Sequence, residues 1–424
     1  MQTTQGRGVA EKSKGNIWVE GFWFFLPPPL RRYGSIRAMS SESPVLRDRR
    51  RERLLFLDLD MGSQKLAVLL CLMMLYACGI RPGSVKPLVN ARPTFITDDM
   101  DVDMPGASTD TVIVTYLGCG GLLIGRNGKA ILVDPFFSNQ KFMRIGRSLI
   151  FGSRSIRPDK EAIDKGVTEI NRILSENRLT LTTILVAHSH YDHLMDVPAI
   201  VRMLPHHPWI LVNRTGYNIC RAVLDSSRVV ILEDHLSRAP QRTSPVAVNG
   251  TGIHVYPIPA DHNPHFRNIE FFSGEQTVPV DDFKDPLQRT RVNMWLDGNT
   301  FSFVVDFLDD TTTVAFRVFI QSTSCNPPAG VPSEEVTRIR KTDIAFLGVV
   351  SFHFSPEYPC AQLDQLQPAE IVWVHWEDFF RRYGKSPKTV RGTDIPGFFQ
   401  LPCVGEYDIP GKLMPPLTTI RLLY

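Results

Sequence analysis

The sequence predicts an α/β fold in which two β-sheets pack face to face and carry helices on their outer faces. Strand patterns come first along the chain, strands and helices then alternate, and strands return near the C-terminus. Apolar runs bounded by polar residues are typical of strands in a covered sheet. Hydrophobic residues make up 43% of the 424 residues and charged residues 21%, which is enough apolar material for a sizeable core.

The N-terminal half of this pattern begins with a strand at residue 111. A tight glycine-rich turn follows it, and Asn127-Gly128 then closes a hairpin, because this pair supplies the positive φ angles of a two-residue turn. A helix is expected over 159–178, where isoleucine and valine recur near helical spacing. Another helical pattern covers 194–204 and stops at Pro205. Strands are expected over 111–117, 122–125, 130–133 and 181–187.

The C-terminal half returns to strands after an irregular stretch. Residues 263–291 are polar, lack periodicity and contain three prolines. A long irregular loop in a compact domain is usually functional, often as a lid, so we expect an insertion there. Strands are expected over 209–212, 228–232, 253–258, 301–307, 313–320, 344–350 and 371–374.

Charge and cysteine content exclude some classes of protein. The net charge of +3 is too small to indicate nucleic-acid binding, and basic residues crowd the first sixty positions. The seven cysteines have no regular spacing and no CxxC pair. Neither a zinc ribbon nor a disulfide scaffold is therefore expected.

The apolar block at residues 66–77 predicts a secretory signal. It is shorter than the roughly 20 residues of a transmembrane helix, and Lys65 and a possible start at Met61 precede it. The sequence around Cys78 resembles the lipobox of bacterial lipoproteins, in which the cysteine is lipidated, although Tyr76 stands where a small residue is usual. A short buried helix is the alternative interpretation.

This interpretation divides the chain into four parts. Residues 61–78 would be a lipoprotein-type signal, and residues 1–60 a disordered or wrongly assigned extension upstream of it. A transit peptide is the competing idea for the upstream part, but its acidic residues count against that. Residues 79–109 are expected to be a linker and residues 110–424 the folded domain. The expected location is the bacterial cell envelope, with a membrane anchor through lipid on Cys78.

The most informative segment is His188-Ser-His-Tyr-Asp-His193, directly after an apolar run. It places four metal-binding side chains within six residues at the end of an expected buried strand, where open α/β folds carry their chemistry. In extended backbone His188 and His190 point the same way and can bind one ion. Asp192 and His193 follow the bend and face a neighbouring position. A polar loop with chance histidines is disfavoured, because the whole chain has 11 histidines.

This segment matches the HxHxDH signature and resembles the metallo-β-lactamase superfamily. The order of motifs is most similar to the branch that contains ascorbate-lactonase-like hydrolases and N-acyl-phosphatidylethanolamine phospholipase D. The further matching motifs are Tyr116-Leu-Gly-Cys-Gly-Gly121, Val133-Asp134-Pro135, Pro259-Ala260-Asp261-His262 and Trp373-Val374-His375. The resemblance implies a four-layer αββα sandwich with a dinuclear metal centre. One ion would bind His188, His190 and His262, and the other Asp192, His193 and His375.

Two positions depart from the family pattern. Ser322 stands where the family has a bridging carboxylate, and a neutral hydroxyl is a poor ligand for a divalent ion. The second site is therefore expected to be weak, and one bound ion is an alternative to two. Cys119 replaces a histidine that orients ligands, and we expect a buried thiol there, with metal binding as the alternative. Asp134 is expected to hydrogen-bond a ligand, and His265 is the alternative to His262.

The resemblance implies a metal-dependent hydrolase that uses a metal-bound hydroxide on an ester, lactone or phosphodiester, lipids included. Asp192 would orient the nucleophile and handle protons. Zinc is the expected cofactor, as one or two ions, with iron and manganese as alternatives. The partners would be a small-molecule or lipid substrate and, through the lipid anchor alone, a membrane. A metal-binding envelope lipoprotein with little catalysis and a single-iron dioxygenase are the alternative functions.

Overall fold

The computed structural model describes residues 94–95, 100–104, 110–151, 155–236, 244–248, 250–265, 270–310, 312–405 and 412–423. All of them belong to one compact unit, Gly62–Tyr424. The expected extension at 1–60, the signal at 61–78 and the lipidation site Cys78 lie outside the described residues. Among the residues that are described, no helix is both long and apolar enough to cross a membrane.

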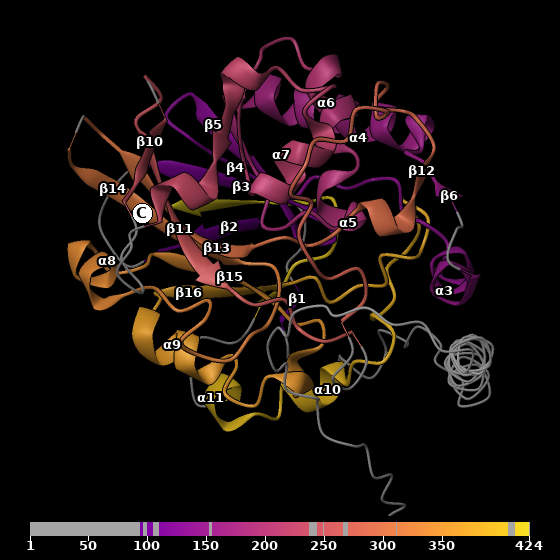
Figure 1. Ribbon diagram of the computed structural model, residues 1–424. Helices are drawn as coiled ribbons and strands as arrows, with labels where there is room; N and C mark the ends of the chain where they lie inside the picture. The colour runs from indigo at the N-terminus through magenta and orange to yellow at the C-terminus, as the bar shows by residue number, and fades with distance from the viewer. Residues whose placement is uncertain are drawn as a thin grey trace, which may run out of the picture. The chain divides into compact units, whose positions relative to one another are not determined.

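The strands form two eight-stranded mixed sheets (Figure 1). The order in the first sheet is β2-β18-β3-β4-β5-β7-β8-β9. Its strands are β2 (Met100–Asp103), β18 (Thr418–Leu423), β3 (Thr111–Gly118), β4 (Gly121–Arg126), β5 (Lys129–Val133), β7 (Thr180–Leu185), β8 (Trp209–Val212) and β9 (Val229–Ile231). The order in the second is β1-β17-β16-β15-β14-β13-β11-β10. Its strands are β1 (Thr94–Phe95), β17 (Lys412–Leu413), β16 (Glu370–Val374), β15 (Ile344–Gly348), β14 (Val314–Gln321), β13 (Thr300–Leu308), β11 (Ile253–Ala260) and β10 (Val246–Val248).

Helices and short connecting elements complete the fold. The α-helices are α3 (Phe142–Phe151), α4 (Lys160–Glu176), α5 (Tyr191–Leu194), α6 (Val197–Met203), α7 (Arg214–Cys220), α8 (Glu334–Ile339), α9 (Cys360–Leu366), α10 (Ile395–Phe398) and α11 (Pro402–Gly405). The 3-10 turns are η1 (Ser226–Arg228), η2 (Leu232–His235), η3 (Val292–Met294) and η4 (Phe352–Phe354). A two-stranded ribbon pairs β6 (Ser155–Ile156) with β12 (Thr290–Arg291).

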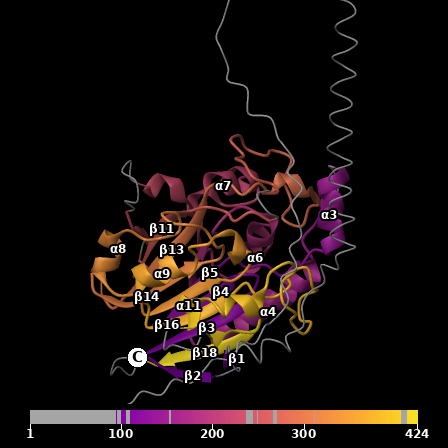
Figure 2. The ribbon, with the colours of Figure 1, turned by 90° about the horizontal axis from the view of Figure 1, so that it is seen from below.

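Three apolar clusters show how the layers pack. One cluster lies between the two sheets and joins side chains such as Val114 and Ile124 of the first to Phe303 and Val305 of the second. A second cluster joins the outer face of the first sheet to α4, α6 and α7. The third joins the outer face of the second sheet to α8, α9 and α10. Helices α4 and α9 accordingly lie on opposite sides of the sheets in both views (Figures 1 and 2). The structure therefore has the expected α/β architecture with four layers in the order αββα.

Local sequence accounts for the elements that lead to the site. Asn127 and Gly128 have φ angles of 49° and 76°, so the β4–β5 hairpin closes on the expected turn. Asp159 caps α4 by accepting a hydrogen bond from the Ala162 main-chain N–H at 3.3 Å, and the apolar face of α4 is buried. Strands β5, β7 and β8 run parallel, so their carboxyl ends share one edge of the sheet.

The structure corrects the expected linker in part. Residues 94–95 and 100–103, within the 79–109 range, form the edge strands β1 and β2. Strand β2 pairs in parallel with β18, which was not expected from the sequence either. Edge strands this short have too few alternating residues to stand out as a pattern, and their pairing is decided by neighbours far along the chain.

A disulfide joins Cys360 in α9 to Cys403 in α11, across 43 residues of sequence. The other described cysteines, Cys119, Cys220 and Cys325, are free and buried. Irregular cysteine spacing carries no information about one long-range pair, because only the packing of α9 beside α11 brings the two side chains together.

Candidate metal centre

The histidine-rich segment lies where β7 gives way to α5. His188 follows the strand by three residues, and His190 immediately precedes the helix that carries Asp192 and His193. All four side chains are buried. Asp196 fixes the far end of the segment, because it accepts hydrogen bonds from the main-chain N–H groups of Phe137 and Ser138, both at 2.8 Å. The loop after β5 is thereby tied to the loop after α5.

Three of the expected ligands form the first group. One ligand atom each from His188, His190 and His262 lies within 4.8 Å of the others. His262 reaches the pair from the end of β11, and its ring centroid is 4.7 Å from that of His188 and 4.5 Å from that of His190. Its Nδ1 lies 2.7 Å from the Asn263 carbonyl oxygen, which leaves Nε2 as the ring nitrogen free to bind an ion. His265 stacks on His262 at 4.7 Å but is not part of the group.

The imidazoles of this group have the properties of metal ligands. Within the described part of the chain, both ring nitrogens of His188 and Nε2 of His190 are buried without a hydrogen-bond partner. A buried polar atom without a partner is costly, and a coordinated ion would satisfy one ring nitrogen of each histidine. Burial, together with the neighbouring histidines, lowers the pKa of His188 and of His190 well below the usual value. Both rings are therefore neutral and can offer a lone pair, so the residues fit a metal ion.

A second group brings together Cys119, Asp192 and His375, again with one ligand atom each within 4.8 Å of the others. The Cys119 Sγ lies 4.0 Å from Asp192 Oδ2. His375 Nδ1 is buried and has no hydrogen-bond partner among the described residues. The expected set of Asp192, His193 and His375 is thus only partly reproduced, because Cys119 stands in the group and His193 does not.

His193 lies between two carboxylates. Its Nε2 is 3.9 Å from Asp192 Oδ2, and its Nδ1 is 3.0 Å from Asp134 Oδ2. The contact between Nδ1 and Asp134 is short, but it is not aligned as a hydrogen bond. Nδ1 therefore has no hydrogen-bond partner among the described residues. Burial lowers the pKa of His193, but the charges of Asp134 and Asp192 outweigh burial and the net shift is upward. The raised pKa favours the protonated ring, whose positive charge lies between the two carboxylates.

Ser322, at the position expected for a bridging carboxylate, acts as a donor. Its Oγ donates to Asp134 Oδ2 at 2.7 Å, while Asp134 Oδ1 accepts from the Ala187 main-chain N–H at 2.8 Å. Asp134, expected beside a ligand, thus lies against His193 and is held by the loop that leads into the histidine segment. Ser322 supports this carboxylate and offers no negative charge of its own.

Sequence reasoning missed a pair that holds the second group in place. The Tyr116 hydroxyl donates to Glu377 Oε2 at 2.7 Å and accepts from the His375 main-chain N–H at 2.8 Å. Glu377 also accepts from the Cys119 main-chain N–H. Tyr116 opens one of the matching motifs but was given no role of its own, and nothing in the local pattern marks Glu377. Their partnership depends on the first and second sheets meeting at this edge.

Two cavities meet at the histidines. A small one of about 50 Å³ is lined by the three histidines of the first group and by Asp192 and His375 of the second. A larger one of about 360 Å³ is lined by His190 and Asp192 at one end and by aromatic side chains elsewhere, among them Phe271, Phe272, Phe354, Phe379 and Phe380. Two of these phenylalanines come from the irregular 263–291 segment. This segment therefore forms part of the wall beside the candidate centre.

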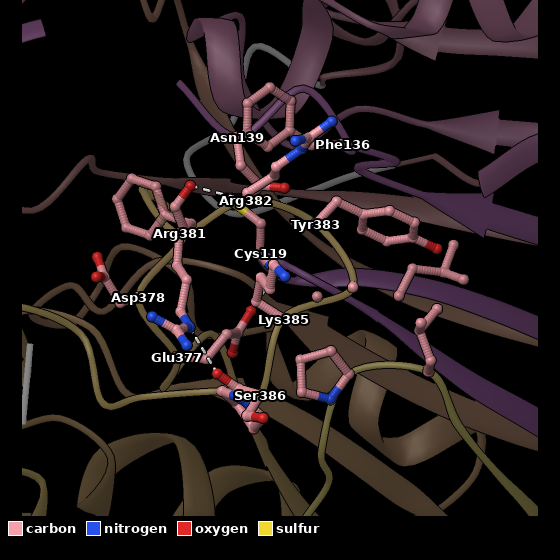
Figure 3. Close-up of a pocket in the computed structure, with 17 residues that line it drawn as sticks. Cys119, Phe136, Asn139, Glu377, Asp378, Arg381, Arg382, Tyr383, Lys385 and Ser386 are labelled. Carbon is pink, nitrogen blue, oxygen red and sulfur yellow. Dashed lines mark hydrogen bonds between the residues drawn. The ribbon is translucent and has the colours of Figure 1, made fainter. Parts of the chain in front are cut away.

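A third cavity, of about 250 Å³, approaches from the Cys119 side (Figure 3). Cys119 and Glu377 line it together with Arg381, Arg382 and Lys385, whereas Asp192 and His375 do not. The second group therefore lies between the third cavity, which Cys119 lines, and the small cavity, which Asp192 and His375 line.

No family model matches the chain, and no curated protein matches it. Among solved structures the chain is similar to Igni18, a novel metallo hydrolase from the hyperthermophilic archaeon Ignicoccus hospitalis, with 14% identity over 74% of this chain and 99% of that one and a TM-score of 0.41. It is also similar to an isothiocyanate hydrolase from Delia radicum gut bacteria, with 14% identity over 72% of this chain and 98% of that one and a TM-score of 0.38. CmlA, a diiron β-hydroxylase from Streptomyces venezuelae, matches with 14% identity over 76% of this chain and 55% of that one and a TM-score of 0.35. At these identities and TM-scores, none of the three assigns an activity to this chain.

Proposed function

We propose that this chain is a metal-dependent hydrolase with its ion at His188, His190 and His262. The observation that carries the proposal is the set of buried imidazole nitrogens without partners, placed where a small polar cavity meets a larger aromatic one. Three protein ligands with an open position are typical of catalytic zinc sites. A bound divalent ion supplies a Lewis acid and lowers the pKa of a bound water to about 7.

Asp192 is the residue best placed to move protons in the reaction. It lines both the small and the large cavity, so its carboxylate faces the space where a substrate would lie. Burial raises its pKa, which makes it a stronger base than an exposed aspartate. His193 lies beside it, with Nε2 3.9 Å from Asp192 Oδ2 and Nδ1 3.0 Å from Asp134 Oδ2.

The proposed substrate is an ester, lactone or phosphodiester that carries an apolar group, lipids included. The larger cavity supports this, because about 360 Å³ suits a small organic molecule and its wall is largely aromatic. The irregular segment that contributes Phe271 and Phe272 would cover the apolar part of the substrate.

The test uses protein purified without added metal. Elemental analysis gives the identity and number of ions, and hydrolysis is followed with p-nitrophenyl esters of short and long acyl chains, with simple lactones and with bis(p-nitrophenyl) phosphate. His190→Ala should lose both the ion and the activity. His206→Ala, which changes an exposed histidine away from the site, is the matched control and should keep both.

Two other results would redirect the proposal. A tightly bound ion with no hydrolysis of any of these substrates would favour the alternative function, a metal-binding protein without catalysis. Ser322, which stands at the position of a bridging carboxylate, supports that alternative. Iron in place of zinc would favour oxidative chemistry. Absence of any ion, with no effect of His190→Ala, would overturn the metal centre altogether.

We also propose that the protein is held at a bacterial membrane by lipid on Cys78. The disulfide between Cys360 and Cys403 supports an oxidising compartment, where such bonds persist. Expression in bacteria with radiolabelled palmitate should label the native chain and not Cys78→Ser, which should leave the membrane fraction. Cys71→Ser, within the same apolar block, is the control and should behave as the native chain.

A further inference from the structure

We propose that Cys119 is a direct ligand of a second metal ion, which it shares with Asp192 and His375. The inference rests on the proposed function, because it places this ion beside the one at His188. In this arrangement the thiolate supplies the negative charge that the bridging carboxylate would bring at the position of Ser322. The sequence offered metal binding by Cys119 only as the alternative to a buried thiol.

The distances within the group suit a common ion. Zinc bonds of about 2.0–2.3 Å place the ligands of one tetrahedral ion about 3.3–3.8 Å from one another. The Cys119 Sγ is 4.0 Å from Asp192 Oδ2, and all three donors lie within 4.8 Å of one another.

The buried and unpaired ring of His375 is an independent observation that supports the site. Its side chain is 3% exposed, and Nδ1 has no hydrogen-bond partner in the described part of the chain. A core histidine normally donates or accepts through its buried nitrogens. His375 also lines the small cavity that Asp192 lines, so its ring borders the space where an ion would sit.

The backbone under both ligands is held in an unusual conformation. Cys119 and His375 have φ angles of 52° and 53°, in the left-handed region that residues with side chains rarely adopt. The Tyr116 hydroxyl accepts from the His375 N–H, and Glu377, which Tyr116 contacts, accepts from the Cys119 N–H. One buried pair therefore positions both ligands, and backbone strain of this kind gathers at functional sites.

The chemistry of the group favours a particular class of ion. Thiolate, imidazole and one carboxylate suit zinc, cobalt or cadmium better than magnesium or manganese. Binding would displace the thiol proton into solvent, and no atom would change its oxidation state. The two negative charges of Asp192 and the Cys119 thiolate would then balance the charge of one divalent ion.

Another buried free cysteine provides the contrast. Cys325 donates to the Ala329 carbonyl oxygen at 3.3 Å and lies in neither group of donors. The Cys119 thiol instead faces Asp192, donating to its carbonyl oxygen at 3.6 Å and lying 4.0 Å from its Oδ2. Cys325→Ser is therefore the matched control for Cys119→Ser, because both changes replace a buried thiol by a hydroxyl.

The experiment loads the full chain with Co²⁺ and records its near-ultraviolet absorption and bound cobalt. The native protein and Cys325→Ser should both show thiolate-to-cobalt charge-transfer absorption and bind two ions. Cys119→Ser should lose that absorption together with one ion. His190→Ala should lose the other ion and retain the absorption.

Each contrary result has a distinct meaning. Bound cobalt without charge-transfer absorption in the native protein would overturn this inference and leave the proposed hydrolase intact. Absorption that persists in Cys119→Ser would overturn it as well. If no cobalt binds to the native protein, the inference and the proposed function fail together. Should Cys119→Ser not fold, Cys119→Ala takes its place, with the same expected loss of the absorption and of one ion.

Discussion

Ser322 donates a hydrogen bond to Asp134 across the two sheets, from Oγ to Oδ2 at 2.7 Å, and both side chains are buried. Ser322 follows the end of β14, and Asp134 follows the end of β5, so the bond joins the carboxyl ends of strands in different layers. Asp134 in turn contacts His193 at 3.0 Å. Ser322 was expected to matter because it lacks a negative charge. In the structure it instead supports the Asp134 carboxylate, which lies against His193.

Ser322→Ala should destabilise the protein by about 1–3 kcal/mol, because it removes a donor from a buried carboxylate oxygen. Denaturant unfolding in the presence of a chelator measures the effect without a contribution from metal. Ser302→Ala is the matched control: Ser302 is fully buried and its hydroxyl has no partner among the described residues, so its loss should cost little. Equal stability of the two variants would contradict the role given to Ser322.

Ser322→Asp should make stability depend more strongly on metal. Without an ion, the new carboxylate stands against Asp134 and lowers the free energy of unfolding, because two buried like charges repel. With zinc present the added ligand should tighten the second site, and an ion at a hundred times its Kd stabilises by about 2.7 kcal/mol. Thermal unfolding with zinc and with chelator gives the difference. Ser322→Asn, which adds no charge, should show no larger metal response than the native protein.

Tyr116→Phe should weaken the second ion site as well as the fold. The change removes the hydroxyl that donates to Glu377 and accepts from the His375 N–H, leaving buried groups unpaired at a cost of about 1–3 kcal/mol. Tyr358→Phe is the control, since the buried Tyr358 hydroxyl donates to the Gly348 carbonyl oxygen at 2.7 Å. Both variants should lose stability, but cobalt titration should show a weakened second ion only in Tyr116→Phe. Unchanged cobalt binding there would limit Tyr116 to a structural role.

Asp196 should make the protein more stable as the pH falls below about 6. Burial raises the pKa of this carboxyl to about 6, above the value of an unfolded aspartate. The folded state therefore binds the proton more tightly than the unfolded state, and its stability relative to Asp196→Asn should grow by about 1 kcal/mol between pH 7 and pH 5. Denaturant unfolding of both proteins across this range measures the difference. A difference that is constant with pH would show that Asp196 keeps an ordinary pKa.

Phe380→Ala should impair long-chain substrates more than short ones. Phe380 lines the larger cavity and packs edge-on against Phe142, at 5.1 Å between ring centroids. Losing this contact should raise KM for a p-nitrophenyl ester with a long acyl chain while kcat changes little, because such binding is equal in ground and transition states. The acetate ester serves as the internal control. An equal loss for both esters would place the apolar part of the substrate elsewhere.

Short-range pattern was enough to predict the parts of this protein that local chemistry decides. The Asn127-Gly128 turn, the helix α4 and the strand before His188 follow from neighbouring residues, because turn geometry and apolar periodicity act over a few positions. The pair His188 and His190 could be predicted for the same reason. His262 and His375 could be predicted only through the resemblance to a known family.

The membership of the second group was decided by tertiary structure. Cys119 and Asp192 are 73 residues apart, and Tyr116 and Glu377 are 261 apart, so no local pattern links either pair. The disulfide between Cys360 and Cys403 is of the same kind. Local pattern therefore predicted a two-sheet fold with histidines gathered at a strand end. Which side chains complete that centre depended on how the carboxyl ends of the two sheets pack together, because that packing sets the distances between residues remote along the chain.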